Sequence, residues 1–195
     1  HVGMGLGGDI VPTSAFQSAN PIYILLFGIP FSWLWLFLAQ RNADPSAPVK
    51  FGLGLLQLGL GFLALYWGAE VSTDRGMVSM AFLLLAYLLH TTGELCLSPV
   101  GLSMVTKLSP KRLVSTTMGA WFLALALSNL LAAIIAVFTG VGHGGGGESA
   151  GIPVPAETLP VYAGVFQTIG FAACAAAVVL FAVSPILTRW MHGVK

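Results

Sequence analysis

The sequence predicts an all-α membrane protein, a polytopic bundle of helices that cross the bilayer. Composition leads to this prediction, because 56% of the 195 residues are apolar and only 8% are charged. Soluble domains carry about 25% charged residues. Runs such as MVSMAFLLLAYLL also lack the polar residue at every second position that is typical of a transmembrane β-strand. Helices are therefore the structure that satisfies the backbone in lipid.

Five segments are apolar over about 20 residues or more, the length that a helix needs to cross a bilayer. In chain order we predict an outer-side loop at 1–14, spans at 15–40, 51–69, 77–105 and 114–141, a Gly-rich outer loop at 142–159, a span at 160–188 and a tail at 189–195.

The first two spans carry different signals. The first opens with the polar string FQSANP, and Pro21 is typical of the first turn of a helix. Asn20 is then either a helix N-cap or a polar group that binds a ligand. The second span carries Gly52, Gly54, Gly59 and Gly61. Glycines seven residues apart fall near one helical face, which favours tight packing or lipid-facing flexibility over a role in a site.

The third span holds Glu94, the only acidic residue inside any of the five. An ionised carboxylate at membrane depth costs several kcal/mol, so Glu94 is a candidate functional residue. His90, Thr91 and Ser98 share its helical face, and Pro99 predicts a kink. We expect a polar stripe that lines a cavity. Two alternatives are a structural hydrogen bond between His90 and Glu94, and a contact of Glu94 with a helix of a larger complex.

The fourth span contains Trp121, which is either a pocket wall or an anchor at the membrane interface. The glycine-rich loop after this span lacks the phosphate-binding pattern GxxxxGK[ST], which indicates a flexible linker before the fifth span.

Several functional classes are excluded. A net charge of +1 gives no basis for binding nucleic acid, and no Lys/Arg cluster in the sequence suggests a lipid headgroup site. Cys96 and Cys174 form no metal-binding spacing, and His90 lacks a second histidine. No span carries a Ser–His pair or a carboxylate pair with a nucleophile, so we predict neither an enzyme nor a metal site.

The basic residues predict the orientation, because cytoplasmic connections carry the excess of Lys and Arg. One side of the predicted bundle holds Arg41, Lys50, Lys107, Lys111, Arg112, Arg189 and Lys195. The other side holds Arg75 beside Glu70 and Asp74. We therefore expect a cytoplasmic C-terminus and an N-terminus on the outer side.

Three strings resemble the proton-dependent oligopeptide transporter family, the POT or PTR family of the major facilitator superfamily. FQSANPIYILLFGIPFSWLW resembles its eighth transmembrane helix, GELCLSPVGLSMVTKLSP its tenth and MGAWFLALALSN its eleventh. The resemblance covers about residues 16–185. It implies helices 8–12, a partial C-terminal half of the fold, which needs a companion N-terminal segment with helices 1–7. It also implies a bacterial inner membrane.

The resemblance implies symport of di- and tripeptides with protons by alternating access, with no cofactor besides the coupling proton. Glu94 resembles the glutamate that receives the peptide's amino terminus and takes part in gating. Asn20 resembles an asparagine that hydrogen-bonds the peptide backbone, and Trp121 a wall of a side-chain pocket that Leu125 extends. The expected substrate-binding residues are Glu94, Asn20, Trp121, Ser98 and Leu125, and the expected coupling or gate residues are Glu94, His90 and Pro99. The alternative is a structural membrane subunit whose Glu94 pairs with a partner helix.

Overall fold

Five apolar helices make up most of the computed structural model, which describes residues 2–3, 18–71, 78–138 and 155–191. The helices are α2 (Ala19–Gln40), α3 (Ala47–Val71), α4 (Met80–Leu108), α5 (Val114–Phe138) and α6 (Pro155–Trp190). Two-residue strands β1 (Val2–Gly3) and β2 (Val78–Ser79) pair in parallel. Each helix contains a stretch long and apolar enough to cross a membrane, which confirms the predicted all-α membrane bundle.

Parts of the predicted connections lie outside the described residues. These are the outer loop at 1–14 apart from Val2 and Gly3, residues 142–154 of the Gly-rich loop, and residues 192–195 of the tail.

Local chemistry sets where α3 and α4 begin and end. The Ser46 carbonyl accepts the backbone N–H groups of Val49 and Lys50 at 2.9 and 3.1 Å. Helix α3 therefore starts at Ala47, four residues before the predicted span. A proline at position 48 does not prevent this start, because proline is tolerated in the first turn of a helix. At the start of α4 the Ser79 side chain accepts the Ala81 N–H at 3.4 Å. Helix α4 ends at Leu108, shortly before a proline that disfavours further helix.

Helix α2 ends in a Schellman motif, in which two backbone N–H groups return to carbonyls of the last turn. The Ala43 N–H donates to the Leu38 carbonyl at 3.0 Å, and the Asn42 N–H donates to the Ala39 carbonyl at 3.1 Å. Asn42 has a φ of 54°, in the left-handed region that asparagine tolerates better than most residues. This motif turns the chain from α2 toward α3.

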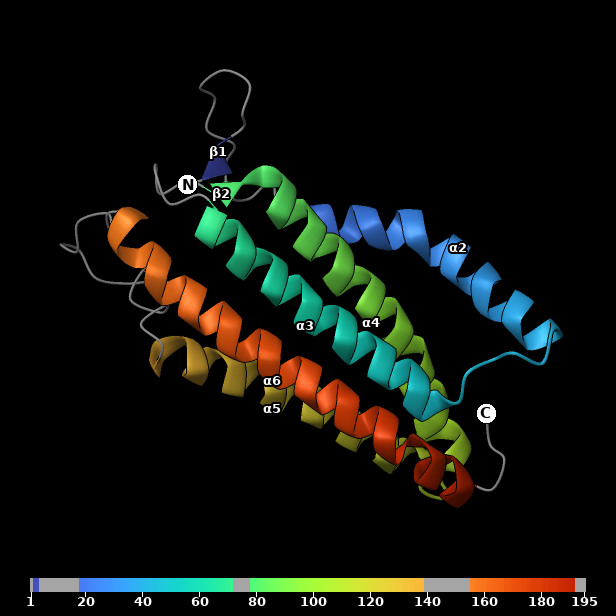
Figure 1. Ribbon diagram of the computed structural model, residues 1–195. Helices are drawn as coiled ribbons and strands as arrows, with labels where there is room; N and C mark the ends of the chain where they lie inside the picture. Colours follow the sequence, from blue (N-terminus) through green and yellow to red (C-terminus); the bar gives the residue numbers. More distant parts are fainter. Residues whose placement is uncertain (1, 4–17, 72–77, 139–154, 192–195) are drawn as a thin grey trace.

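Helix α3 is the centre of the bundle. Figure 1 shows α3 between α4 and α6, with α2 on the far side of α4. The buried residues of α3 are Ala47, Pro48, Gly52, Gly54, Gly59, Gly61, Gly68 and Ala69. Every one is a glycine, an alanine or a proline, so backbone rather than bulky side chain occupies the two interfaces.

One set of α3 glycines faces α4. A Cβ on Gly54 would lie 2.5 Å from Leu97 Cγ and 2.9 Å from the Gly93 carbonyl oxygen. A Cβ on Gly61 would lie 2.5 Å from the His90 ring, and one on Gly68 would lie 2.8 Å from the Phe82 ring. These three glycines are seven residues apart, so they form one continuous contact stripe along α3.

The other set of α3 glycines faces α6. A Cβ on Gly52 would lie 2.7 Å from the Phe181 ring, and one on Gly59 would lie 2.5 Å from Cys174 Sγ. Helix α6 reciprocates, since a Cβ on Gly170 would lie 2.8 Å from Leu63 Cγ. The glycines predicted as a packing feature therefore serve two neighbours, one stripe for each.

Helices α2 and α5 are peripheral in the described part of the chain and pack mainly against α4. No residue of α2 is buried, and Leu25 and Ile29 are both 79% exposed. On α5, Leu123 is 61% exposed. Such apolar faces suit contact with lipid or with further helices, which is where a membrane protein places them.

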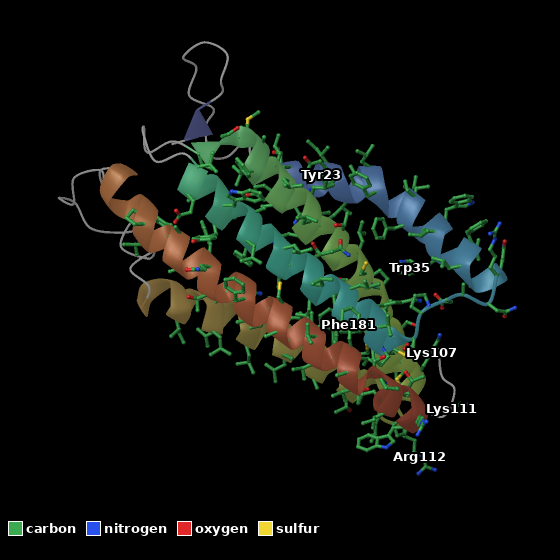
Figure 2. All side chains as sticks on the ribbon, viewed as in Figure 1. Tyr23, Trp35, Lys107, Lys111, Arg112 and Phe181 are labelled. Carbon is green, nitrogen blue, oxygen red and sulfur yellow. The ribbon has the colours of Figure 1, made fainter. Side chains whose placement is uncertain are left out.

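The two ends of the bundle differ in charge. The α2–α3 connection, the α4–α5 turn and the C-terminal end of α6 lie at one end, and the short strands lie at the other (Figure 1). The basic residues that the structure describes all lie at the end with the α2–α3 connection, in the connecting segments or in the helical turns next to them. They are Arg41, Lys50, Lys107, Lys111, Arg112 and Arg189. Figure 2 labels three of them, Lys107, Lys111 and Arg112, at this end of the bundle. We call this the basic end.

We predict that Gly54→Ala destabilises the protein by about 1–3 kcal/mol, the usual range for overpacking. The added Cβ meets a backbone oxygen of α4, so the helix itself has to move. The matched control is Gly28→Ala in α2, where nothing lies within 4 Å of the new atom. Thermal unfolding of the purified transporter in detergent should show a lower Tm for Gly54→Ala alone; equal Tm values would contradict the packing role.

We predict that Asn42→Val destabilises the α2–α3 connection by about 1–2 kcal/mol, because the left-handed conformation is costly for a β-branched residue. Asn42→Gly should be tolerated, since glycine adopts this conformation without a steric penalty. The same unfolding assay compares the two variants, and a glycine variant as unstable as the valine variant would show that the asparagine side chain, not the backbone conformation, matters.

Candidate functional site

Glu94 lies on an open face of α4 in the middle of the chain's apolar bundle. Its side chain is exposed, whereas the flanking Thr91, Gly93 and Cys96 are buried. Among the acidic residues of the described helices, Glu70 and Glu157 belong to end turns, and Glu94 alone lies far from a helix end. The fold thus keeps this carboxylate out of the α3–α4 interface and leaves it available to a group that comes from elsewhere.

His90 lies in a different environment from Glu94. Its ring packs against α3, with a ring-centroid distance of 4.7 Å to Phe62, and occupies the space beside Gly61. Its Nε2 is buried and has no hydrogen-bond partner. In the described part of the chain no hydrogen bond or ion pair joins His90 to Glu94, so the structure does not show the structural pair that the sequence left open.

The predicted polar stripe is divided between two faces. Thr91 is fully buried, with 0% exposure and a hydroxyl that has no partner, while Ser98 and Pro99 are exposed beside Glu94. A helical arc that includes residues 90, 91, 94 and 98 is wide enough to meet more than one neighbour. Glu94, Ser98 and Pro99 therefore share the open face, and His90 and Thr91 do not. Helix α4 continues through Pro99 to Leu108.

Gln57 of α3 is a polar neighbour of this region that the sequence indicates only weakly. Its Nε2 donates to Cys96 Sγ at 3.6 Å. Its Cβ lies 3.4 Å from the position that a Cβ added to Gly93 would occupy. Gly93 precedes Glu94 directly and contacts the Gly54 carbonyl. The signal in the sequence was an amide side chain on a glycine-rich apolar helix. Together Gln57 and Gly93 hold α4 against α3 next to the carboxylate.

Trp121 of α5 packs against α4. A Cβ on Gly101 would lie 2.7 Å from Trp121 Cη2, so the indole covers this glycine. Gly101 follows Glu94 by seven residues, which is two turns or about 10 Å along the same face of α4. The indole also lines an open pocket of about 540 Å³ with Phe51 and Thr117. Trp121 therefore lines a pocket between α4 and α5.

Asn20 and Leu125 lie on the two peripheral helices. Asn20 is the second residue of α2, and Ser18 holds the N-cap position, so the N-cap alternative for Asn20 is not what the structure shows. The Asn20 Oδ1 atom is buried and has no hydrogen-bond partner. Leu125 lies one turn beyond Trp121 and is 47% exposed. Helix α4 packs against both α2 and α5, so it is the common element of the predicted site.

The described residues include no group of three His, Cys, Asp or Glu side chains that could hold a metal ion. The residues predicted from the sequence supply one open carboxylate, a buried amide oxygen and an aromatic wall, on three different helices.

Comparison with known proteins shows which family the chain belongs to. The model of the POT family, PTR2, matches residues 5–148. The chain belongs to the POT family. This is a family of membrane transporters and not of enzymes, as the resemblance in the sequence indicated.

Individual relatives agree with this membership. The chain is 37% identical over 194 residues to the uncharacterized transporter YclF of Bacillus subtilis, covering 100% of this chain and 35% of that protein. It is 36% identical over 186 residues to dipeptide and tripeptide permease B of Aliivibrio fischeri, covering 95% of this chain and 36% of the permease. The chain thus spans about a third of the length of these relatives.

Solved structures of the family share the fold. A crystal structure of a peptide transporter POT in complex with sulfate matches with a TM-score of 0.77 at 34% identity, over 96% of this chain and 34% of that one. A POT family transporter in complex with a thioalcohol-conjugated peptide matches with a TM-score of 0.67 at 28% identity, over 89% and 31% of the two chains. The five-helix arrangement is therefore part of a POT transporter fold.

We predict that a cysteine at position 98 reacts several times faster with a water-soluble maleimide than one at position 91. Ser98 is on the open face of α4 and Thr91 is fully buried, and only an accessible thiolate reacts. Ser98→Cys and Thr91→Cys should be compared in the purified transporter with Cys96 and Cys174 replaced by alanine. Similar rates at both positions would show that α4 is rotated relative to this description.

Proposed function

We propose that this chain forms the C-terminal part of the binding site and gate of a proton-coupled symporter of di- and tripeptides. The remaining helices, 1–7 of the family's fold, would come from an N-terminal segment of the same transporter. Family membership supports the class of transport, and the permease relatives support the substrate class. The observation that carries the proposal is the position of Glu94, an acid placed at membrane depth and left open.

The carboxylate suits the amino terminus of a peptide. An ionised acid in an apolar bundle is stable only with a compensating charge or with water, and in the described residues Glu94 has no cationic partner. An ammonium group supplies a charge and up to three hydrogen-bond donors. Ion pairs of this kind are strong when they are well formed in a cavity of low dielectric constant. Substrate binding would then satisfy a group that the fold leaves unsatisfied.

The other residues of the open side supply complementary contacts. The Oδ1 of Asn20 has no hydrogen-bond partner among the described residues, and it would accept a hydrogen bond from a peptide N–H group if a small movement of α2 exposed it. The Trp121 indole offers an apolar wall for a side chain, which the half-exposed Leu125 extends, and the Ser98 hydroxyl lies one turn from Glu94. These contacts would come from α2, α4 and α5. Closure of the site would therefore require these helices to approach the N-terminal segment with helices 1–7.

Proton coupling would act through the same carboxylate. Protonation of Glu94 removes the charge that holds the ammonium group, so proton and peptide binding at this acid are linked thermodynamically. Pro99, which removes one backbone hydrogen bond of α4, offers a hinge beyond Glu94 for a gating motion. His90 is a residue of α4 whose ring packs against Phe62 of α3. It would therefore act through the packing of α4 and not through direct contact with substrate.

The orientation follows from the charges. The basic end would face the cytoplasm, so the C-terminus would be cytoplasmic. The bacterial permease relatives support a bacterial plasma membrane as the location.

We predict that Glu94→Gln abolishes proton-driven uptake of a dipeptide by the complete transporter and leaves the protein folded. The amide keeps the shape of the side chain but cannot carry the charge that an ammonium group needs. The matched control is Glu70→Gln, the same change in the last turn of α3, which should retain uptake. Uptake is measured in proteoliposomes with an imposed pH gradient, and unchanged uptake by Glu94→Gln would overturn the assigned role.

A thermal-shift measurement tests the alternative of a non-transporting assembly subunit. The wild-type transporter should gain thermal stability with a dipeptide, because a ligand that binds only the folded state stabilises it. Glu94→Gln should lose most of this gain. If no peptide stabilises the wild type and Glu94→Gln instead releases a partner protein, then Glu94 serves assembly.

A further inference from the structure

A second pocket lies at the basic end, next to the one that Trp121 lines, with which it shares Phe51, Met104 and Leu108. It has a volume of about 260 Å³ and is formed where the start of α3 meets the C-terminal ends of α4 and α6. Its walls include Pro48, Phe51, Met104, Leu108, Leu187 and Met191. Every residue that lines it is apolar. A peptide with charged termini finds no polar partner here, so the pocket suits a hydrocarbon chain.

The depth of the pocket corresponds to the membrane interface. Met191, which lines it, follows Trp190, the last residue of α6 and 74% exposed. Tryptophan at the end of a spanning helix typically lies at the level of the lipid headgroups. The pocket therefore starts at headgroup level and extends toward the interior of the bilayer, along the path that an acyl chain takes.

The basic residues at this end of the bundle differ in whether they have an acidic or aromatic partner. On the α2 side of the basic end, the Arg41 guanidinium lies 4.2 Å from the centre of the Phe37 ring. Lys50 pairs with Asp44 at 2.7 Å and lies 4.7 Å from the centre of the Trp35 ring. These two cations therefore already have partners.

Three cations of the other connecting segments at this end differ from Arg41 and Lys50. Lys111 and Arg112 follow Leu108 in the turn after α4, and Arg189 is in the last turn of α6. In the described part of the chain none of these three has an acidic or aromatic partner. Figure 2 labels Lys111 and Arg112 at the same end of the bundle as the last turn of α6. Positive charge without an acidic or aromatic partner in the described residues thus lies at the end of the bundle that holds the apolar pocket.

We propose that this pocket binds one acyl chain of an anionic phospholipid of the cytoplasmic leaflet, with its phosphate held by Lys111 and Arg112. Basic pockets between transmembrane helices on the cytoplasmic side bind anionic headgroups. Arginine suits a phosphate because its guanidinium donates two parallel hydrogen bonds. The bound lipid would join α3, α4 and α6 at the end of the bundle where α4 leads into the turn to α5. This inference is independent of the peptide proposed as substrate.

Native mass spectrometry of the complete transporter in mild detergent tests the proposal, with phosphatidylglycerol and phosphatidylcholine of identical acyl chains as probes. We expect retention of phosphatidylglycerol over phosphatidylcholine. Arg112→Gln should weaken phosphatidylglycerol binding roughly fivefold, which corresponds to the contribution of one basic residue near the membrane surface. The matched control is Arg41→Gln, which removes the same charge at the same end but from a helix that does not line the pocket.

The apolar part of the site has its own pair of variants. Leu187→Trp fills the pocket and should abolish retention of phosphatidylglycerol, whereas Ile186→Trp, at an exposed neighbouring position, should not. Equal retention of both lipids by the wild type, or equal effects of Arg41→Gln and Arg112→Gln, would overturn the proposal. If lipid binds only after deletion of residues 192–195, the tail is the natural occupant and the proposal is wrong.

Discussion

The close approach of α3 to both α4 and α6 is the constraint on which the rest of the structure depends. Lipid provides no hydrophobic force between helices, so their association relies on van der Waals contact and on interhelical hydrogen bonds. Glycine allows the backbones to meet. Gly54 and Gly93 contact each other across the interface, since a Cβ on either would lie 2.9 Å from the carbonyl oxygen of the other. The rotation of α4 around its axis is fixed by this contact, one residue before Glu94.

That fixed rotation separates two roles on one helix. One face of α4 carries His90, Gly93 and Cys96 into the interface with α3, and the other presents Glu94 and Ser98 to the open side. The layer of α3, α4 and α6 is held by backbone contact, while α2 and α5 pack on α4 with mostly exposed surfaces. Alternating access is largely a rigid-body motion of one part against another around a central site. In the proposed function, the layer of α3, α4 and α6 would be one of the parts that move.

The basic end shows how the same charges serve two purposes. Its excess of lysine and arginine is the pattern that orients a membrane protein. The fold then distributes these residues so that Arg41 and Lys50 meet aromatic rings or Asp44, while Lys111, Arg112 and Arg189 have no acidic or aromatic partner in the described residues. The sequence places Lys111 and Arg112 next to each other, but it does not reveal the apolar pocket at the same end of the bundle, because the walls of that pocket come from three helices. Orientation and lipid binding can therefore draw on one set of residues.

The sequence by itself determined the five spans, because length and apolar composition are local properties, and it determined the family, because the motifs are continuous strings. It also singled out Glu94 as a candidate, since an acid at membrane depth is costly. Helical spacing also gave the seven-residue repeat of the glycines. Only the tertiary structure decided which neighbour each glycine stripe meets, that His90 and Thr91 turn away from Glu94, and that Trp121 covers Gly101. The reason is geometric: periodicity places residues on a helical face, but it does not say which other helix covers that face. The sequence could not predict the pocket at the basic end either, because its walls come from three helices that only packing brings together.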